Sequence, residues 1–145
     1  MRSNLIRYLC VPMVLSSALA LRHGPKTGAP IRDEDAQVIQ MTAKKYEFSP
    51  PHVRLKQGMR VQLKIAALDR DHGFKCAVVP DGGDPSGLPG LEFTTPQGNE
   101  GWKLKKGKET TIEFFAKTPG TYEFGCSVAC GIRHGRMKGE LVVEP

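Results

Sequence analysis

Four side chains that bind soft metal ions lie close together near the C-terminal end of the chain. They are Cys126, Cys130, His134 and Met137, which follow the spacing C-x3-C-x3-H-x2-M. Thiolate, imidazole and thioether groups are donors that suit copper. Strand-like sequence lies on both sides, over residues 120–125 and 139–144, so a rigid sheet is expected to hold the donors. The spacing therefore predicts a metal site on a loop between two strands.

The rest of the chain predicts an all-β domain that could hold such a loop. Sixteen Gly and eleven Pro among 145 residues indicate many turns, which favours strands over a helix bundle. The clearest half-buried strand is expected where apolar and polar side chains alternate most regularly. The expected strands cover residues 37–48 (with a bulge at Lys44 and Lys45), 53–55, 61–67 (the clearest), 74–79, 110–115, 121–125 and 139–143. About seven short strands separated by turns are typical of a small β-sandwich.

One segment does not fit this strand pattern. Residues 80–101 contain several Gly, Pro and Asp and form a loop that is longer than average. We interpret it as a surface insertion without a chemical role, and Trp102, which follows it, as a packing residue.

The N-terminal region predicts export from the cytoplasm. Residues 1–20 are interpreted as a signal peptide, because two arginines precede a short apolar stretch that ends in the cleavage pattern Ala18-Leu19-Ala20. An uncleaved signal anchor is the alternative. Residues 21–36 are rich in Gly, Pro and charge and are expected to be a flexible linker, which leaves 37–145 as the folded domain. We therefore expect a periplasmic or other extracytoplasmic protein with no membrane span after processing.

The charge of the chain argues against nucleic-acid binding. The formal net charge is +6, but no run of five or six basic residues occurs and aromatic residues do not alternate with the Lys and Arg. The charge is expected to keep the protein soluble and to steer an acidic partner.

His72 lies far from the C-terminal loop, between a polar turn and an apolar segment. Alone it would be interpreted as a surface or capping histidine. Together with the loop it becomes a candidate distant ligand, and with it residues 37–145 resemble the cupredoxins. The resemblance is narrower to the CuA copper-binding domain of cytochrome c oxidase subunit II and nitrous oxide reductase. It is carried by His72 with the following Gly73-Phe74, and by Cys126, Cys130, His134 and Met137.

The resemblance implies a cupredoxin-like Greek-key β-sandwich that holds two copper ions and transfers electrons. By this resemblance Cys126 and Cys130 bridge the two ions, His72 and Met137 complete one of them, and His134 and the main-chain carbonyl of Val128 complete the other. The family often has Glu where this chain has Val128, but it uses the backbone oxygen there. The implied partner is a c-type cytochrome or a terminal oxidase or reductase. Subunit II proteins usually carry transmembrane helices and an aromatic-rich docking patch, which are not evident here, so a free-standing domain is expected.

Other readings of the same residues remain open. Cys126 and Cys130 could form a disulfide in an exported protein. Together with His72 and His134 they could instead bind zinc. A mononuclear type 1 copper site needs only His72, Cys130, His134 and Met137, which would leave Cys126 without a role. Cys76 lies in an apolar run and is interpreted as a buried core thiol.

The alternatives to electron transfer are a copper carrier that delivers the metal to an oxidase, and an enzyme. We expect no enzymatic activity, because the predicted ligand set is complete and no general base is placed beside the loop by its spacing.

Overall fold

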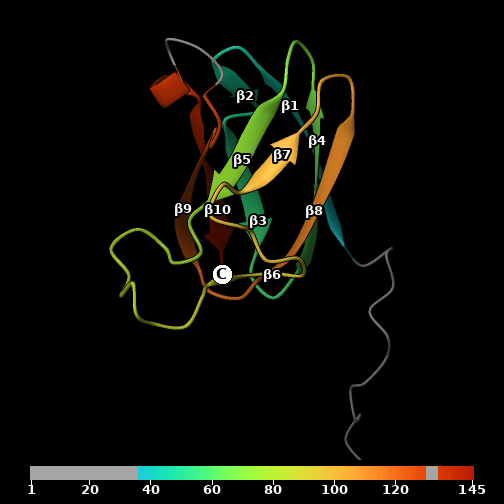
Figure 1. Ribbon diagram of the computed structural model, residues 1–145. Helices are drawn as coiled ribbons and strands as arrows, with labels where there is room; N and C mark the ends of the chain where they lie inside the picture. Colours follow the sequence, from blue (N-terminus) through green and yellow to red (C-terminus); the bar gives the residue numbers. More distant parts are fainter. Residues whose placement is uncertain (1–35, 130–133) are drawn as a thin grey trace, which may run out of the picture. The chain divides into compact units, whose positions relative to one another are not determined.

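The computed structural model describes residues 36–129 and 134–145, and these residues form two β-sheets. The elements are β1 (Gln37–Lys44), β2 (Glu47–Ser49), β3 (His52–Lys56), β4 (Arg60–Ala67), β5 (His72–Cys76), β6 (Leu91–Phe93), β7 (Trp102–Leu104), β8 (Glu109–Ala116), β9 (Gly120–Gly125), the 3-10 helix η2 (His134–Arg136) and β10 (Lys138–Glu144). One sheet has the order β2-β1-β4-β8-β6 and the other β3-β10-β9-β5-β7 (Figure 1). The predicted all-β sandwich is confirmed, with ten strands in the described residues rather than about seven. Among these residues no helix is long and apolar enough to cross a membrane.

Three short strands account for the higher count. β2, β6 and β7 have three residues each, too few for alternation to be visible in the sequence. The bulge expected at Lys44 and Lys45 is instead a tight turn with Tyr46 at a φ of 88°, and β2 folds back antiparallel on β1. The strand expected over 74–79 begins earlier, at His72, and ends at Cys76.

The interior between the sheets is formed by the apolar faces of the alternating strands. Val61 and Leu63 of β4 are fully buried, and β4 lies between β1 and β8. In the second sheet, β5 and β9 contribute Phe74 and Phe124, whose ring centroids are 5.2 Å apart. Full burial of an apolar side chain of this size stabilises a fold by about 1.5–3 kcal/mol. The core therefore fixes the two strands that lead to the predicted metal site.

The segment after β5 is only partly a surface insertion. Residues 81–89 are exposed, but the side chain of Gln97 is hydrogen-bonded to the backbone of Cys76 in β5. This side chain accepts a hydrogen bond from the amide of Cys76 at 3.2 Å and donates one to the carbonyl of Cys76 at 2.7 Å. A Cβ atom at Gly101, where φ is +69°, would lie 2.2 Å from the carbonyl oxygen of Phe74. Residues 97–101 are therefore fixed against the strand that begins with His72.

Candidate metal centre

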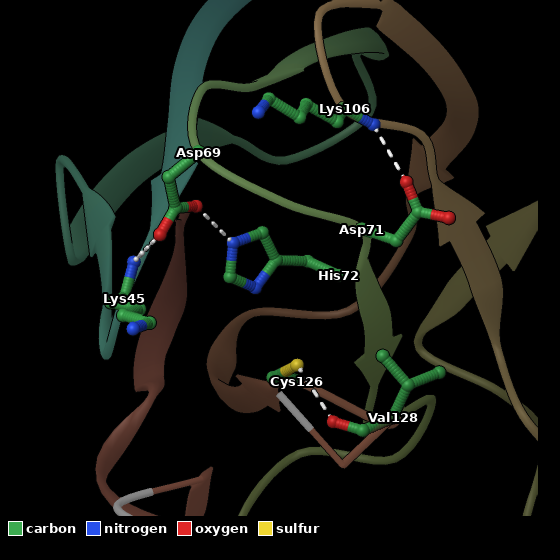
Figure 2. A network of polar contacts seen from close by, with 7 residues as sticks. All are labelled: Lys45, Asp69, Asp71, His72, Lys106, Cys126 and Val128. Atoms are coloured by element: carbon green, nitrogen blue, oxygen red, sulfur yellow. Dashed lines mark hydrogen bonds and ion pairs between the residues drawn. The ribbon is translucent and has the colours of Figure 1, made fainter. Parts of the chain in front are cut away.

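The imidazole of His72 is buried at the first position of β5, with 1% of the residue exposed. Its Nε2 atom lies 2.7 Å from Oδ1 of Asp69. The other ring nitrogen, Nδ1, is buried and has no hydrogen-bond partner within the described residues. In Figure 2 this nitrogen is on the side of the ring that faces Cys126 and Val128. A buried polar atom without a partner costs about 1–3 kcal/mol, so the arrangement fits a metal ion as the missing partner.

The carboxylate of Asp69 fixes the orientation of this ring. Its second oxygen, Oδ2, accepts a hydrogen bond from the backbone amide of Lys45 at 3.0 Å, so the carboxylate itself is held. Desolvation raises the pKa of Asp69, but hydrogen bonds from His72 and Lys45 and attraction to the imidazole together hold the pKa below its usual value. An ionised carboxylate keeps the ring proton on Nε2, which leaves the lone pair of Nδ1 available to a metal.

Asp71 anchors the other side of the turn that precedes His72. Its Oδ1 accepts a hydrogen bond from the backbone amide of Lys106 at 2.9 Å, and its Oδ2 lies 2.8 Å from Nζ of Lys105. These contacts with Lys105 and Lys106 hold the pKa of Asp71 below its usual value. Asp69 and Asp71 therefore tie the turn to both neighbouring turns, as Figure 2 shows.

The two ends of the predicted ligand loop are joined at its base. The backbone amide of Cys126 donates a hydrogen bond to the carbonyl of Met137 at 3.0 Å. Cys126 follows β9 and is 9% exposed, and Met137 precedes β10 and is completely buried. The antiparallel pairing of β9 with β10 thus places a thiol and a thioether side by side in a protected position.

The first residues of the loop lie against the start of β5. The Sγ atom of Cys126 lies 3.3 Å from the carbonyl oxygen of Val128, as a donor to it. A Cβ atom at Gly73 would lie 2.2 Å from Oγ of Ser127 and 3.0 Å from the amide nitrogen of Val128. Glycine at position 73 therefore lets the loop approach the strand that carries His72.

The structure brings together part of the predicted ligand set. His72, Cys126 and Met137 are buried, and the carbonyl of Val128 is beside the Cys126 thiol. Cys130 lies outside the described residues; His134 begins η2, and its side chain also lies outside the described part. Within residues 36–129 and 134–145, no three His, Cys, Asp or Glu side chains form a metal site by themselves. The full ligand set remains a prediction.

Several positioning residues were not predicted from the sequence. The spacing of Asp69, three residues before His72, was a usable signal, because a carboxylate is a common partner of a metal-binding histidine. Ser127, whose hydroxyl donates to the carbonyl of Glu100, gave no such signal, because its partner lies far away in the sequence.

Cys76 is a core thiol, as the sequence indicated. It is 3% exposed, and its Sγ atom donates to the carbonyl of Ala77 at 3.3 Å. Burial raises the pKa of this thiol well above its usual value, so it stays protonated at neutral pH.

A β-sandwich with a buried imidazole, thiol and thioether near one end is suited to bind a soft metal ion such as copper. The chain belongs to the cupredoxin family, because residues 10–143 match the family model of the cupredoxin-like domain. Membership of this family implies copper binding, and the donors described above fit that ion.

The chain is similar to several named proteins. It is 26% identical over 106 residues to cytochrome c oxidase subunit 2 of Thermus thermophilus, an alignment that covers 73% of this chain and 64% of the relative. A second subunit 2 sequence from this species also matches, and the alignment covers 52% of its length. The chain therefore spans less than two thirds of the length of either relative. Among solved structures, auracyanin B has a TM-score of 0.56 at 20% identity, covering 79% of this chain and 94% of that one. A chain of a heme-copper terminal oxidase dimer has a TM-score of 0.53 at 16% identity, and the match covers 92% of this chain and 79% of that one. At these identities the two structures establish a shared fold.

Proposed function

We propose that this protein is an exported electron carrier with a dinuclear copper centre of the CuA type. The observation that carries the proposal is the buried Nδ1 atom of His72, which has no partner within the described residues and faces the segment of Cys126 and Val128. When bound, copper would supply a reversible one-electron couple. The electron-transfer function is also supported by the similarity to cytochrome c oxidase subunit 2.

Six residues would hold the metal ions. Cys126 and Cys130 would be shared thiolates, His72 and Met137 would complete one ion, and His134 and the carbonyl of Val128 would complete the other. The short distance between Cys126 Sγ and the Val128 carbonyl, 3.3 Å, supports this grouping. The hydrogen bond between Cys126 and Met137 supports it as well.

The protein would contribute rigidity and protection from water. Asp69 orients the His72 ring, and Gly73 lets the loop lie against β5. Complete burial of Met137 keeps the thioether away from solvent. A fixed donor geometry limits rearrangement when the oxidation state changes, which favours rapid electron transfer.

The proposed setting is the periplasm or another extracytoplasmic space. Residues 1–20 would direct export, and residues 21–36 would link the processed end to the folded domain. The proposed partner is a c-type cytochrome or a terminal oxidase or reductase, and the protein itself would not be an enzyme.

Copper stoichiometry with optical and EPR spectra tests the proposal, on protein expressed without residues 1–20. Two copper ions per chain are expected, with hyperfine structure from two equivalent nuclei that share one unpaired electron. Copper that exchanges freely and gives little colour would instead indicate a copper carrier. Either that result or one copper per chain would overturn the dinuclear electron carrier.

A mononuclear type 1 site is the second candidate. The donors His72, Cys130, His134 and Met137 suffice for it, and the fold is shared with auracyanin A of Chloroflexus aurantiacus, a blue copper protein. Cys126→Ser separates the two candidates. The substitution should abolish a dinuclear spectrum but leave a mononuclear one, built on Cys130, recognisable.

A further inference from the structure

Three turns of the chain meet around the strand end that carries His72. They are residues 44–47, 68–71 and 105–108, and we call them together the basic end face. The middle turn is bonded to both others. The carboxylate of Asp69 accepts a hydrogen bond from the amide of Lys45 at 3.0 Å, and that of Asp71 accepts one from the amide of Lys106 at 2.9 Å. In Figure 1 the three turns lie at the same end of the sandwich.

The basic end face carries the excess positive charge of the described residues. Its three turns contain six Lys and Arg against three Asp and Glu, whereas the remaining described residues contain nine of each. The turns are near one another, so their charges add into one local positive potential. A surplus confined to one end is a stronger indication of a binding surface than a surplus spread over the molecule.

The acidic side chains of this face are already engaged within it. Asp69 is bonded to His72 and to the amide of Lys45, and Asp71 to Lys105 and the amide of Lys106. Glu47, in the first turn, forms an ion pair with Lys44 at 2.9 Å. By contrast, the side chains of Lys45, Lys106 and Lys108 are exposed and form no ion pair within the described residues.

An apolar side chain lies in the middle turn of this basic surface. Leu68 is 54% exposed, and Val38 and Leu88 are the other large apolar residues with such exposure among those described. Leu68 is also four residues from His72, the candidate metal ligand. An apolar spot inside a charged surface is the arrangement of a protein–protein docking site, in which the charges orient the partner and the apolar contact holds it.

We propose that the basic end face docks a redox protein whose own docking surface is acidic around a small apolar patch. This assignment rests on the proposed electron-transfer function for the redox character of the partner. The partner's surface is expected to be acidic because exposed lysines face it, and to contain an apolar patch because Leu68 is exposed. Docking there would place the partner next to the His72 end of the metal centre.

A protein fits this face better than a uniformly anionic polymer or a lipid surface. Glu47 and Asp71 are exposed on the same turns, and their carboxylates would lie against phosphates in such a complex. A protein surface can place separate carboxylates opposite the lysines and leave the remaining positions apolar or neutral.

Reaction with small charged redox complexes tests the sign and position of the potential. One electron would pass from the reduced protein to hexacyanoferrate(III), which becomes hexacyanoferrate(II). At an ionic strength of about 0.01 M, Lys106→Glu should slow this reaction about threefold or more, and the difference should disappear at about 0.3 M. Lys56→Glu, which makes the same charge change at the end of β3, is the matched control and should have a smaller effect. Equal effects of the two variants would overturn the proposal.

A second measurement does not depend on copper redox chemistry. Hexacyanochromate(III) is an inert paramagnetic trianion, so it broadens the NMR signals of amides near its binding site. In the ¹⁵N-labelled protein we expect broadening in residues 44–47, 68–71 and 105–108, and less of it in Lys106→Glu. Broadening elsewhere or spread evenly would overturn the proposal. Broadening of these turns in a protein that transfers no electrons would support the basic face and contradict the electron-transfer function.

Macromolecular probes distinguish a protein partner from other anions. An acidic c-type cytochrome should bind more tightly than a basic one, and Lys106→Glu and Leu68→Ser should each weaken that binding while Lys56→Glu should not. Vesicles of phosphatidylglycerol are the competing probe. Binding to vesicles that depends on Lys106, with no binding to the acidic cytochrome, would overturn the protein partner in favour of a membrane surface.

Discussion

Replacing Asp69 with alanine should weaken copper binding about tenfold while leaving the sandwich folded. The carboxylate lies 2.7 Å from Nε2 of His72 and keeps the lone pair of Nδ1 available to a metal. A hydrogen bond to a charged group contributes about 1.5–3 kcal/mol. Because the Asp69 side chain is 32% exposed, the lower value of about 1.5 kcal/mol applies, which is about tenfold in Kd. Outer partners of metal-binding histidines have effects of about 10–100-fold.

The assay is competition for Cu(I) with a chromophoric chelator, and Asp71→Ala is the matched control. Asp71 lies in the same turn and carries the same charge, but it is bonded to Lys105 and Lys106 instead of the imidazole. Imidazole ¹⁵N NMR of the metal-free protein gives an independent measurement, since the proton should be on Nε2 in the wild type and should be shared between the nitrogens in Asp69→Ala. Equal copper affinities of the two variants, or a proton on Nδ1 in the wild type, would refute the argument.

Three further substitutions test the frame around the site. Gly73→Ala should weaken copper binding, because its Cβ would meet Oγ of Ser127 at 2.2 Å, whereas Gly98→Ala, with open space around its Cβ, should not. Gln97→Ala should lower the free energy of unfolding in urea by about 1–2 kcal/mol through the loss of two hydrogen bonds to Cys76, and a drop below about 0.5 kcal/mol, as for exposed Gln40→Ala, would contradict this. Cys76 has a raised pKa, so its contribution to stability is present below the pKa of the unfolded thiol and is lost as pH rises above it. Between pH ~9 and ~10.5 the wild type should therefore lose more stability than Cys76→Ala, by up to about 1.4 kcal/mol per pH unit, and parallel curves would be inconsistent with a buried neutral thiol.

The sequence predicted those parts of the fold that depend on local alternation. β4 and β8 are long enough for their buried faces to be visible as a period of two, and both were expected near their observed positions. β6 and β7 were not expected, and most of β2 was expected only as the end of a longer first strand, because three-residue strands form only when a longer strand offers hydrogen bonds beside them. The turn at Tyr46 was missed for a related reason, since a positive φ at a tyrosine is set by the surrounding structure and not by its own preference.

In the candidate site, the metal-binding residues could be predicted from the sequence, whereas the contacts that orient them could not. Donor types and their spacing are properties of the sequence, so His72, Cys126 and Met137 could be singled out, and the structure shows all three buried. The contacts that orient them join distant residues, as Asp69 does with Lys45 and Ser127 with Glu100. Such pairs are defined only once the chain has folded.

The position of β10 constrains how this protein is made. It is the last strand in the sequence, yet it lies between β3 and β9, parallel to the first and antiparallel to the second. A chain still emerging from the ribosome, or still crossing a membrane, cannot close this sheet before residues 138–144 are available. Until then β3 and β9 each lack a neighbour, and Cys126 lacks the Met137 carbonyl to which its amide is bonded. A metal site that uses both Cys126 and Met137 can therefore be completed only after residues 138–144 have joined the sheet.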